Sequence, residues 1–251
     1  MSINHISVVM IAKDSEQTIK ASLESLKEFS EVILYLNNSS DKTKEIAKNY
    51  SNVTVIEGEF LGFGATKNKA TSYATNDWIL SLDSDEVLSV EFVQHLQQLQ
   101  LSTDTLYSIL RSNYYKEIPI KHCWGDDVIV RLYNKTVTHF TNKHVHEHII
   151  EDGLKKEMLQ GAVQHYPYSS ISEFIAKADQ YSTLFAQDKA GKKSSSPLKA
   201  FFNAHYSFFR TYILKRGFLD GYAGLIIAFS HMVTNFFKYM KLYELNKELK
   251  K

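Results

Sequence analysis

Two carboxylates, Asp83 and Asp85, stand two residues apart directly after the apolar segment 78–82. Residues two apart in an extended chain point to the same side, so these carboxylates can converge at the end of a strand. Mg²⁺ and Mn²⁺ take hard oxygen ligands of this kind, through one or two carboxylates and the phosphates of a substrate. The pair therefore indicates a divalent-cation site. The alternative is an acidic turn before the helix that begins near Ser89.

The segments that must position this pair alternate between strand and helix patterns over the first 83 residues. The pattern predicts four apolar strands, at residues 6–11, 32–36, 53–56 and 78–82. Helices lie between them, and Ser15 and Asp41 are the expected N-caps of the first two. This alternation predicts βαβ units and a parallel, doubly wound α/β sheet. Ligands bind beyond the carboxyl ends of such strands, where Lys13, Asn37 and Asp83 would lie.

Gly62 and Gly64 precede a predicted helix that carries Lys67. The segment lacks the third glycine of a dinucleotide-binding fingerprint and the Gly-Lys-Ser/Thr of a P-loop. A turn is the simple interpretation of the two glycines. Lys67 remains a candidate for facing a diphosphate.

Composition narrows the class of protein. The chain has 251 residues, with 29 Lys and Arg against 28 Asp and Glu. This balance argues against a globally basic nucleic-acid binder, so no nucleic-acid partner is expected. The single cysteine, Cys123, excludes an intramolecular disulfide and fits a reducing compartment. The N-terminus lacks a signal-peptide pattern, and the longest apolar stretch, 223–237, is short for a bilayer span, so a cytoplasmic location is expected.

The C-terminal part differs in character from the rest. From Leu198 onward nine basic residues stand against three acidic ones, and aromatic residues recur at three- and four-residue steps. On a helix this spacing places on one face Phe201, Phe202, His205, Phe208, Phe209 and Tyr212. An aromatic stripe edged with Lys and Arg suits a helix at the surface of an anionic bilayer. Packing on the catalytic domain or on a second subunit is the alternative.

Four segments in order and spacing resemble glycosyltransferase family 2. They are residues 7–16 (SVVMIAKDSE), 37–43 (NNSSDKT), 62–68 (GFGATKN) and 77–86 (DWILSLDSDE). Within this family the chain is most similar to the bacterial lipopolysaccharide and lipooligosaccharide core glucosyltransferases. This similarity lies in residues 130–133, 145–147 and 217–221. The resemblance implies a GT-A fold, a Rossmann-like nucleotide-binding sheet fused to an acceptor-binding half. We expect a catalytic domain over 1–168, with halves at 1–88 and 104–168, and a C-terminal helical extension over 169–251.

This resemblance implies an inverting enzyme that moves a sugar, glucose, from a UDP-sugar to the inner core of a lipid-linked oligosaccharide. The expected cofactor is Mg²⁺ or Mn²⁺, held by Asp83 and Asp85. The residues expected to bind the nucleotide-sugar are Ala12, Lys13, Glu16, Asn37, Asn38, Lys67 and Asp83. The family usually has Asp near position 37, where this chain has two Asn residues. The expected location is the cytoplasmic face of the inner membrane, as a peripheral protein.

An inverting transferase needs a base that takes the proton of the acceptor hydroxyl. Glu147 is preferred because it lies in the dense segment 144–148 (HVHEH), and Asp126 and Asp127 are the alternatives. The three histidines of that segment alternate, but a zinc site would need further ligands, so contacts with sugar hydroxyls are favoured. His165 ends a predicted strand, 162–165, and is a candidate third ligand of the cation.

Three other functional classes compete with this hypothesis. A metal-dependent nucleotidyltransferase would have a glycine-rich, basic loop after the first strand, and residues 12–15 contain no glycine. A dinucleotide-binding oxidoreductase is disfavoured by the missing third glycine and by the lack of an acid at the end of the second strand. A binding module has little need for both acidic clusters. A family 2 transferase for another surface glycan is a further alternative.

Overall fold

The computed structural model describes residues 3–142 and 147–249. The chain forms two compact units, Met1–Ser112 with Asp126–Tyr166, and Asn113–Gly125 with Pro167–Lys251. The predicted boundary at 168 lies next to the last of these divisions. The segment 113–125, which the sequence assigns to the acceptor half, belongs to the unit that holds the C-terminal helices.

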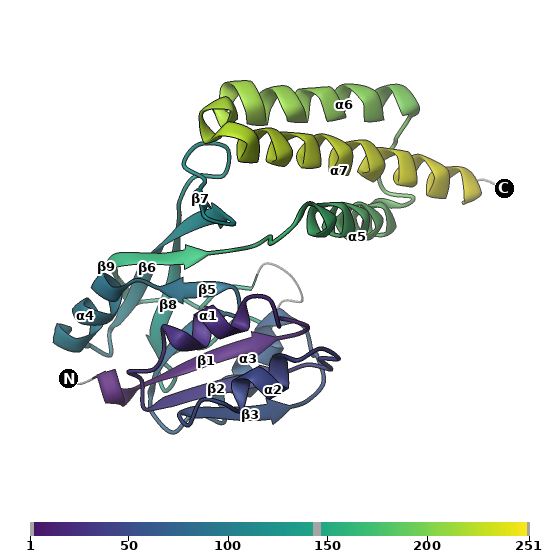
Figure 1. Ribbon diagram of the computed structural model, residues 1–251. Helices are drawn as coiled ribbons and strands as arrows, with labels where there is room; N and C mark the ends of the chain where they lie inside the picture. The colour runs from purple at the N-terminus through teal and green to yellow at the C-terminus, as the bar shows by residue number, and fades with distance from the viewer. Residues whose placement is uncertain (1–2, 143–146, 250–251) are drawn as a thin grey trace. The chain divides into compact units, whose positions relative to one another are not determined.

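The first unit begins with a parallel sheet in the order β3-β2-β1-β4. Its strands are β1 (Ile6–Ala12), β2 (Glu31–Leu36), β3 (Val53–Glu57) and β4 (Trp78–Asp83). The helices that connect them are α1 (Ile19–Glu24), α2 (Thr43–Ala47) and α3 (Phe63–Thr71) (Figure 1). Strands β1, β2 and β4 are buried almost throughout, which explains their near-continuous apolar sequence. The predicted α/β fold is confirmed, with helices α1 and α2 each beginning later than expected.

The two N-caps expected from the sequence are wrong. Helix α1 has Thr18 as its N-cap, and α2 has Lys42. Ser15 lies one turn earlier, where its carbonyl oxygen accepts from the N–H of Ile19 (2.9 Å). Asp41 instead accepts from the N–H groups of Glu16 (2.8 Å) and Thr43 (3.0 Å). Its side chain therefore joins the loops that follow β1 and β2.

The sheet continues in antiparallel fashion beyond β4. Strand β8 (Asp127–Asn134) pairs with β4, and then come β6 (Thr105–Tyr115), β9 (Lys155–His165) and β5 (Glu86–Leu88). Helix α4 (Val90–Gln98) has Ser89 as its N-cap and packs on β9. The whole sheet is thus mixed, and the parallel arrangement holds for its N-terminal half. This is the GT-A type of fold, followed by a helical C-terminal extension.

The second unit contains β7 (Ile118–Pro119) and three helices, α5 (Ile171–Lys189), α6 (Pro197–Phe209) and α7 (Gly221–Glu248). Helix α7 lies alongside both α5 and α6 (Figure 1). A short π-helix (Arg210–Leu214) and a 3-10 helix (Gly217–Asp220) join α6 to α7. Among the described residues, no helix combines the length and the hydropathy that crossing a membrane requires.

Candidate active site

The loops that follow β1 and β2 bring the predicted nucleotide-binding residues together. Strands β1 and β2 end at Ala12 and Leu36, and the N–H of Asn37 donates to the carbonyl of Ala12 (3.1 Å). Lys13 is exposed at the same edge. Asn38 has a left-handed backbone (φ 56°), which Asn tolerates better than most residues. Glu16 accepts from the N–H of Lys42 (3.2 Å), so it belongs to this loop cluster as well.

Lys67 connects the end of β4 with Glu147. Its Nζ lies 3.2 Å from Oδ1 of Asp83 and 3.1 Å from Oε1 of Glu147. Only 5% of the Lys67 side chain is exposed, and Nζ also lies 5.2 Å from the centre of the Phe140 ring. One buried ammonium therefore holds the predicted base beside the predicted cation-site carboxylate.

Gly64 explains how the helix that carries Lys67 comes so close to the segment that carries Glu147. A Cβ at Gly64 would lie 1.8 Å from the carbonyl oxygen of Thr141 and 3.2 Å from Cβ of Glu147. No side chain fits there without displacing backbone. Gly64, which the sequence marks only as part of a turn, is thus required for this close approach.

Sequence reasoning missed a buried network behind Asp83. Glu86 is fully buried, and its carboxylate accepts from the backbone N–H of Asp83 (3.0 Å). The same carboxylate pairs with Arg131 (3.1 Å) and Arg111 (3.3 Å), and Arg131 also pairs with Asp83 (2.6 Å). Arg131 lies in the quoted segment 130–133, but only the pairing of β8 with β4 shows what its guanidinium contacts.

The charges of this network set the ionisation of Asp83. Burial by itself would raise the pKa of Asp83, but the charges of Arg131 and Lys67 outweigh it and hold the pKa well below its ordinary value. Burial likewise would lower the pKa of Arg131, and the carboxylates of Asp83 and Glu86 raise it instead. Asp83 is therefore a carboxylate at any physiological pH.

These groups line a cavity of about 480 Å³. Its ionisable lining consists of Lys67, Asp83, Arg111, Arg131, Glu147, His148, Glu151 and Lys156. Most ligand pockets are largely apolar, whereas this one mixes both charges with Val128, Ile129 and Ile149. Such a lining suits a ligand that carries hydroxyl groups and negative charge.

Asp85 and His165 form the second pair at this edge of the sheet. Oδ2 of Asp85 and Nε2 of His165 lie 3.5 Å apart, because β5 pairs with β9 directly beside them. A carboxylate and an imidazole this close can share one divalent cation, with the remaining positions left to phosphates and water. The oxygens of Asp83 contact Lys67 and Arg131 instead. In the described part of the chain no group of three His, Cys, Asp or Glu residues surrounds a common point.

The remaining predicted residues lie at the margins of this site. Asp127 pairs with Arg111 (2.9 Å), and Asp126 is exposed. His148 is exposed, and its N–H donates to Oγ1 of Thr141 (3.3 Å). His144 and His146 lie outside the described residues. Among the candidate bases, Glu147 is the one whose carboxylate contacts Lys67.

One family model matches more than half of the chain. The profile described as "Glycosyl transferase family 2" matches residues 7–153. An uncharacterized glycosyltransferase of Rickettsia typhi is 30% identical, with 96% of this chain and 87% of that protein covered. The lipopolysaccharide core biosynthesis glycosyltransferase LpsC of Rhizobium meliloti is 23% identical, with 95% and 92% covered. Among solved structures, residues 1–349 of TarS from S. aureus with UDP are 17% identical, with 100% of this chain and 91% of that chain covered and a TM-score of 0.45.

Proposed function

Because the chain belongs to glycosyl transferase family 2, we propose that it transfers glucose from UDP-glucose to the inner core of a lipopolysaccharide or lipooligosaccharide, with inversion at the anomeric carbon. The observation that carries this proposal is the ion pair of Lys67 with both Asp83 and Glu147. All three side chains line one cavity, which supports a common site for the candidate base and for the carboxylate proposed to bind the nucleotide-sugar. The similarity to LpsC supports a lipopolysaccharide acceptor.

Glu147 is the proposed general base. Its carboxylate takes the proton of the acceptor hydroxyl while that oxygen bonds to the anomeric carbon. The bond from the anomeric carbon to the diphosphate breaks in the same step, and UDP leaves. Lys67 orients the Glu147 carboxylate through the ion pair between them. General base catalysis of this kind contributes about 10²–10⁴-fold to the rate.

Asp85 and His165 are the residues proposed to hold Mg²⁺ or Mn²⁺, with Asp83 as the predicted neighbouring ligand. A bound divalent cation would neutralise the charge that develops on the diphosphate. Asp83 is held by Lys67 and Arg131, so its carboxylate also presents a fixed acceptor to the nucleotide-sugar. The nucleotide is proposed to bind at the ends of β1 and β2 and in the loops that follow them, to Ala12, Lys13, Glu16, Asn37 and Asn38.

The C-terminal helices are proposed to attach the enzyme to the cytoplasmic face of the inner membrane. Helix α6 buries its small residues, Ala200 and Ala204. Of its aromatic side chains, Phe201, Phe202 and Phe209 are exposed, whereas Phe208 packs against Phe229. Phe202 is 62% exposed and Tyr206 is 60% exposed. Aromatic side chains next to Lys and Arg suit the interface of an anionic bilayer, where a lipid-linked acceptor would be found.

Ligand-dependent stabilisation separates this proposal from its competitors. Thermal unfolding of the full chain is measured with UDP-glucose, UDP, NAD or a nucleoside triphosphate, each with and without Mn²⁺. The proposal predicts a raised melting temperature with UDP and UDP-glucose that depends on Mn²⁺. Stabilisation by NAD alone, or by nucleoside triphosphates but not by UDP, would favour an oxidoreductase or a nucleotidyltransferase. Glucose transfer to purified core glycolipid, compared across a panel of UDP-sugars, then identifies the donor.

A further inference from the structure

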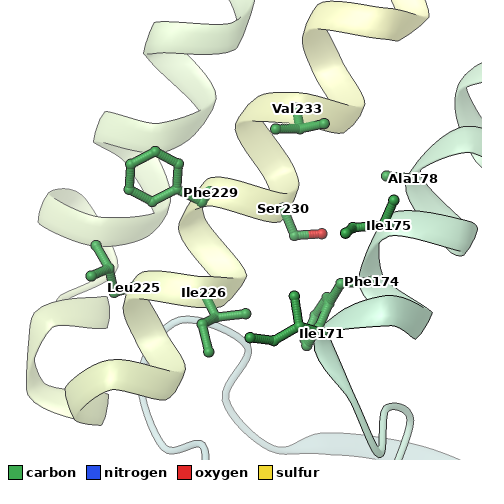
Figure 2. Close-up of a pocket in the computed structure, with 9 residues that line it drawn as sticks. All are labelled: Ile171, Phe174, Ile175, Ala178, Leu225, Ile226, Phe229, Ser230 and Val233. Atoms are coloured by element: carbon green, nitrogen blue, oxygen red, sulfur yellow. The ribbon is translucent and has the colours of Figure 1, made fainter.

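An apolar groove of about 290 Å³ lies between the first halves of α5 and α7. Figure 2 shows side chains of both helices facing it, with Ile171 and Ile226 at one end and Ala178 and Val233 at the other. The full lining is Ile171, Phe174, Ile175, Ala178, Leu225, Ile226, Phe229, Ser230 and Val233. Ser230 supplies the only side-chain hydroxyl in this lining.

The groove is open to solvent along one side, and its lining is almost entirely apolar. Ile175 is 65% exposed and Ile171 is 55% exposed, which is costly for large aliphatic side chains in water. The backbone groups of α5 and α7 are bonded within their own helices, so the groove offers no ladder of donors or acceptors to an extended peptide. A ligand without polar groups matches it best.

The shape of the groove suits a hydrocarbon chain. The groove runs along α5 and α7, from Ile171 and Ile226 at one end to Ala178 and Val233 at the other (Figure 2). An unbranched acyl chain can lie lengthwise in such a groove, and each methylene that it buries there is removed from water, which stabilises binding.

The segment that connects α6 to α7 indicates that a bilayer would supply this acyl chain. Within residues 210–222, large apolar side chains are exposed beside three exposed basic ones. The apolar set is Ile213, Leu214, Phe218, Leu219 and Tyr222, and the basic set is Arg210, Lys215 and Arg216. The one acid of this segment, Asp220, is buried and accepts from the backbone N–H of Cys123 (2.8 Å). Apolar side chains flanked by cations suit an anionic bilayer.

This segment, the basic tip, is continuous with the groove. Leu225 follows Tyr222 by three residues on the same helix, a rise of about 4.5 Å. Leu225 and Ile226 line the end of the groove that lies nearest the N-terminus of α7 (Figure 2). A bilayer that contacts the basic tip therefore lies at the mouth of the groove.

We infer that the groove between α5 and α7 binds an acyl chain of a bilayer lipid, drawn from the membrane that the basic tip contacts. The inference rests on the proposed membrane attachment, which it deepens by naming the ligand and its site. A chain held there shields Ile171, Ile175 and Phe229 from water. The enzyme is thereby retained at the surface on which a lipid-linked acceptor lies.

The test measures binding of cis-parinaric acid, a fatty acid that fluoresces in apolar surroundings, to the full chain below the micellar concentration. Ile175→Asn places an amide in the groove, and Ser230→Phe fills it. We expect each variant to weaken binding about tenfold. Leu184→Asn is the matched control, because Leu184 is also on α5, is 53% exposed and lies outside the groove. Its affinity should stay within about twofold of the parent chain.

No binding by the parent chain, or equal binding by the groove variants and the control, would overturn the inference. The same samples are floated with phosphatidylglycerol vesicles. Flotation without parinarate binding rejects the groove and leaves the membrane attachment standing. Parinarate binding without flotation rejects the attachment and overturns a bilayer lipid as the ligand, leaving a free fatty acid in the groove. Light scattering measures the oligomeric state of the same samples. If the parent chain is a dimer and Ile175→Asn is a monomer, a second copy of the chain occupies the groove, and the inference is overturned.

Discussion

Glu147 and Lys67 form a buried ion pair, with Oε1 and Nζ 3.1 Å apart, at the carboxyl edge of the parallel strands. The same Nζ lies 3.2 Å from Asp83, so one cation serves two carboxylates. Without that cation the two negative charges would face each other across the cavity. This ammonium therefore joins the candidate base to the carboxylate at the end of β4, and substitution of Lys67 tests that link.

Lys67→Met should lower kcat/KM by about tenfold or more, because the carboxylates of Glu147 and Asp83 both lose the ammonium that positions them. Lys69→Met is the control, since Lys69 is exposed on the same helix. Its kcat/KM should stay close to that of the parent chain. Equal kcat/KM values for Lys67→Met and the control would show that Lys67 does not act through Glu147.

Asp85→Asn should raise the Mn²⁺ concentration needed for half-maximal activity by about tenfold or more, because one charged ligand becomes neutral. Saturating Mn²⁺ should recover part of the turnover. The matched control is Asp104→Asn, at an exposed carboxylate that pairs with Lys155. Activity of the parent chain that persists unchanged in EDTA would contradict a metal-dependent mechanism.

The positions of the predicted nucleotide-binding residues could be foreseen because they depend on local sequence. An apolar run that ends in a polar residue predicts a strand end, and alternation with helices predicts a parallel sheet. Ala12, Asn37 and Asp83 therefore lie at one edge as expected. The N-cap predictions were wrong because they also relied on local sequence alone. Asp41 had a partner in another loop, the N–H of Glu16, which local pattern does not reveal.

The network around Glu86 could not be foreseen, because it depends on long-range pairing. Arg131 reaches Asp83 only through the antiparallel register of β8 with β4. The aromatic face of α6 is a similar case. The sequence shows the helical spacing of these aromatic residues. That most of them face solvent follows only from the structure, in which Ala200 and Ala204 are the buried residues of α6. Large apolar side chains are more often buried, and only the structure shows that Phe201, Phe202 and Phe209 are exposed.

Asp220→Ala should lower the free energy of unfolding by about 3 kcal/mol, since it leaves buried N–H groups without an acceptor. The Asp220 carboxylate accepts from the N–H groups of Lys121 (3.0 Å), His122 (3.1 Å) and Cys123 (2.8 Å). Burial and the nearby Asp220 raise the pKa of the Cys123 thiol to about 12. The variant should therefore also react faster with thiol reagents. Glu244→Ala, at an exposed position, is the control for urea denaturation. Equal stability of the two variants would contradict a structural role of Asp220.

Arg210→Gln combined with Arg216→Gln should weaken binding to phosphatidylglycerol vesicles about thirtyfold, since each basic residue at such a surface contributes about 1 kcal/mol. Flotation at rising salt measures the effect, and binding of the parent chain should weaken with salt. Lys192→Gln is the control, at a side chain that is 72% exposed in the loop between α5 and α6. Equal weakening by the control would mean that net charge, and not the basic tip, determines binding.

The most direct test of the account is glucose transfer by Glu147→Gln. Turnover is measured with UDP-glucose, Mn²⁺ and purified core glycolipid, and binding of UDP-glucose is measured on the same samples. The account predicts a turnover number lower by about 10²–10⁴-fold with UDP-glucose affinity nearly unchanged, because the amide cannot take the proton of the acceptor hydroxyl. A Glu147→Gln enzyme that transfers glucose at the rate of the parent chain would contradict the assignment of Glu147 as the base.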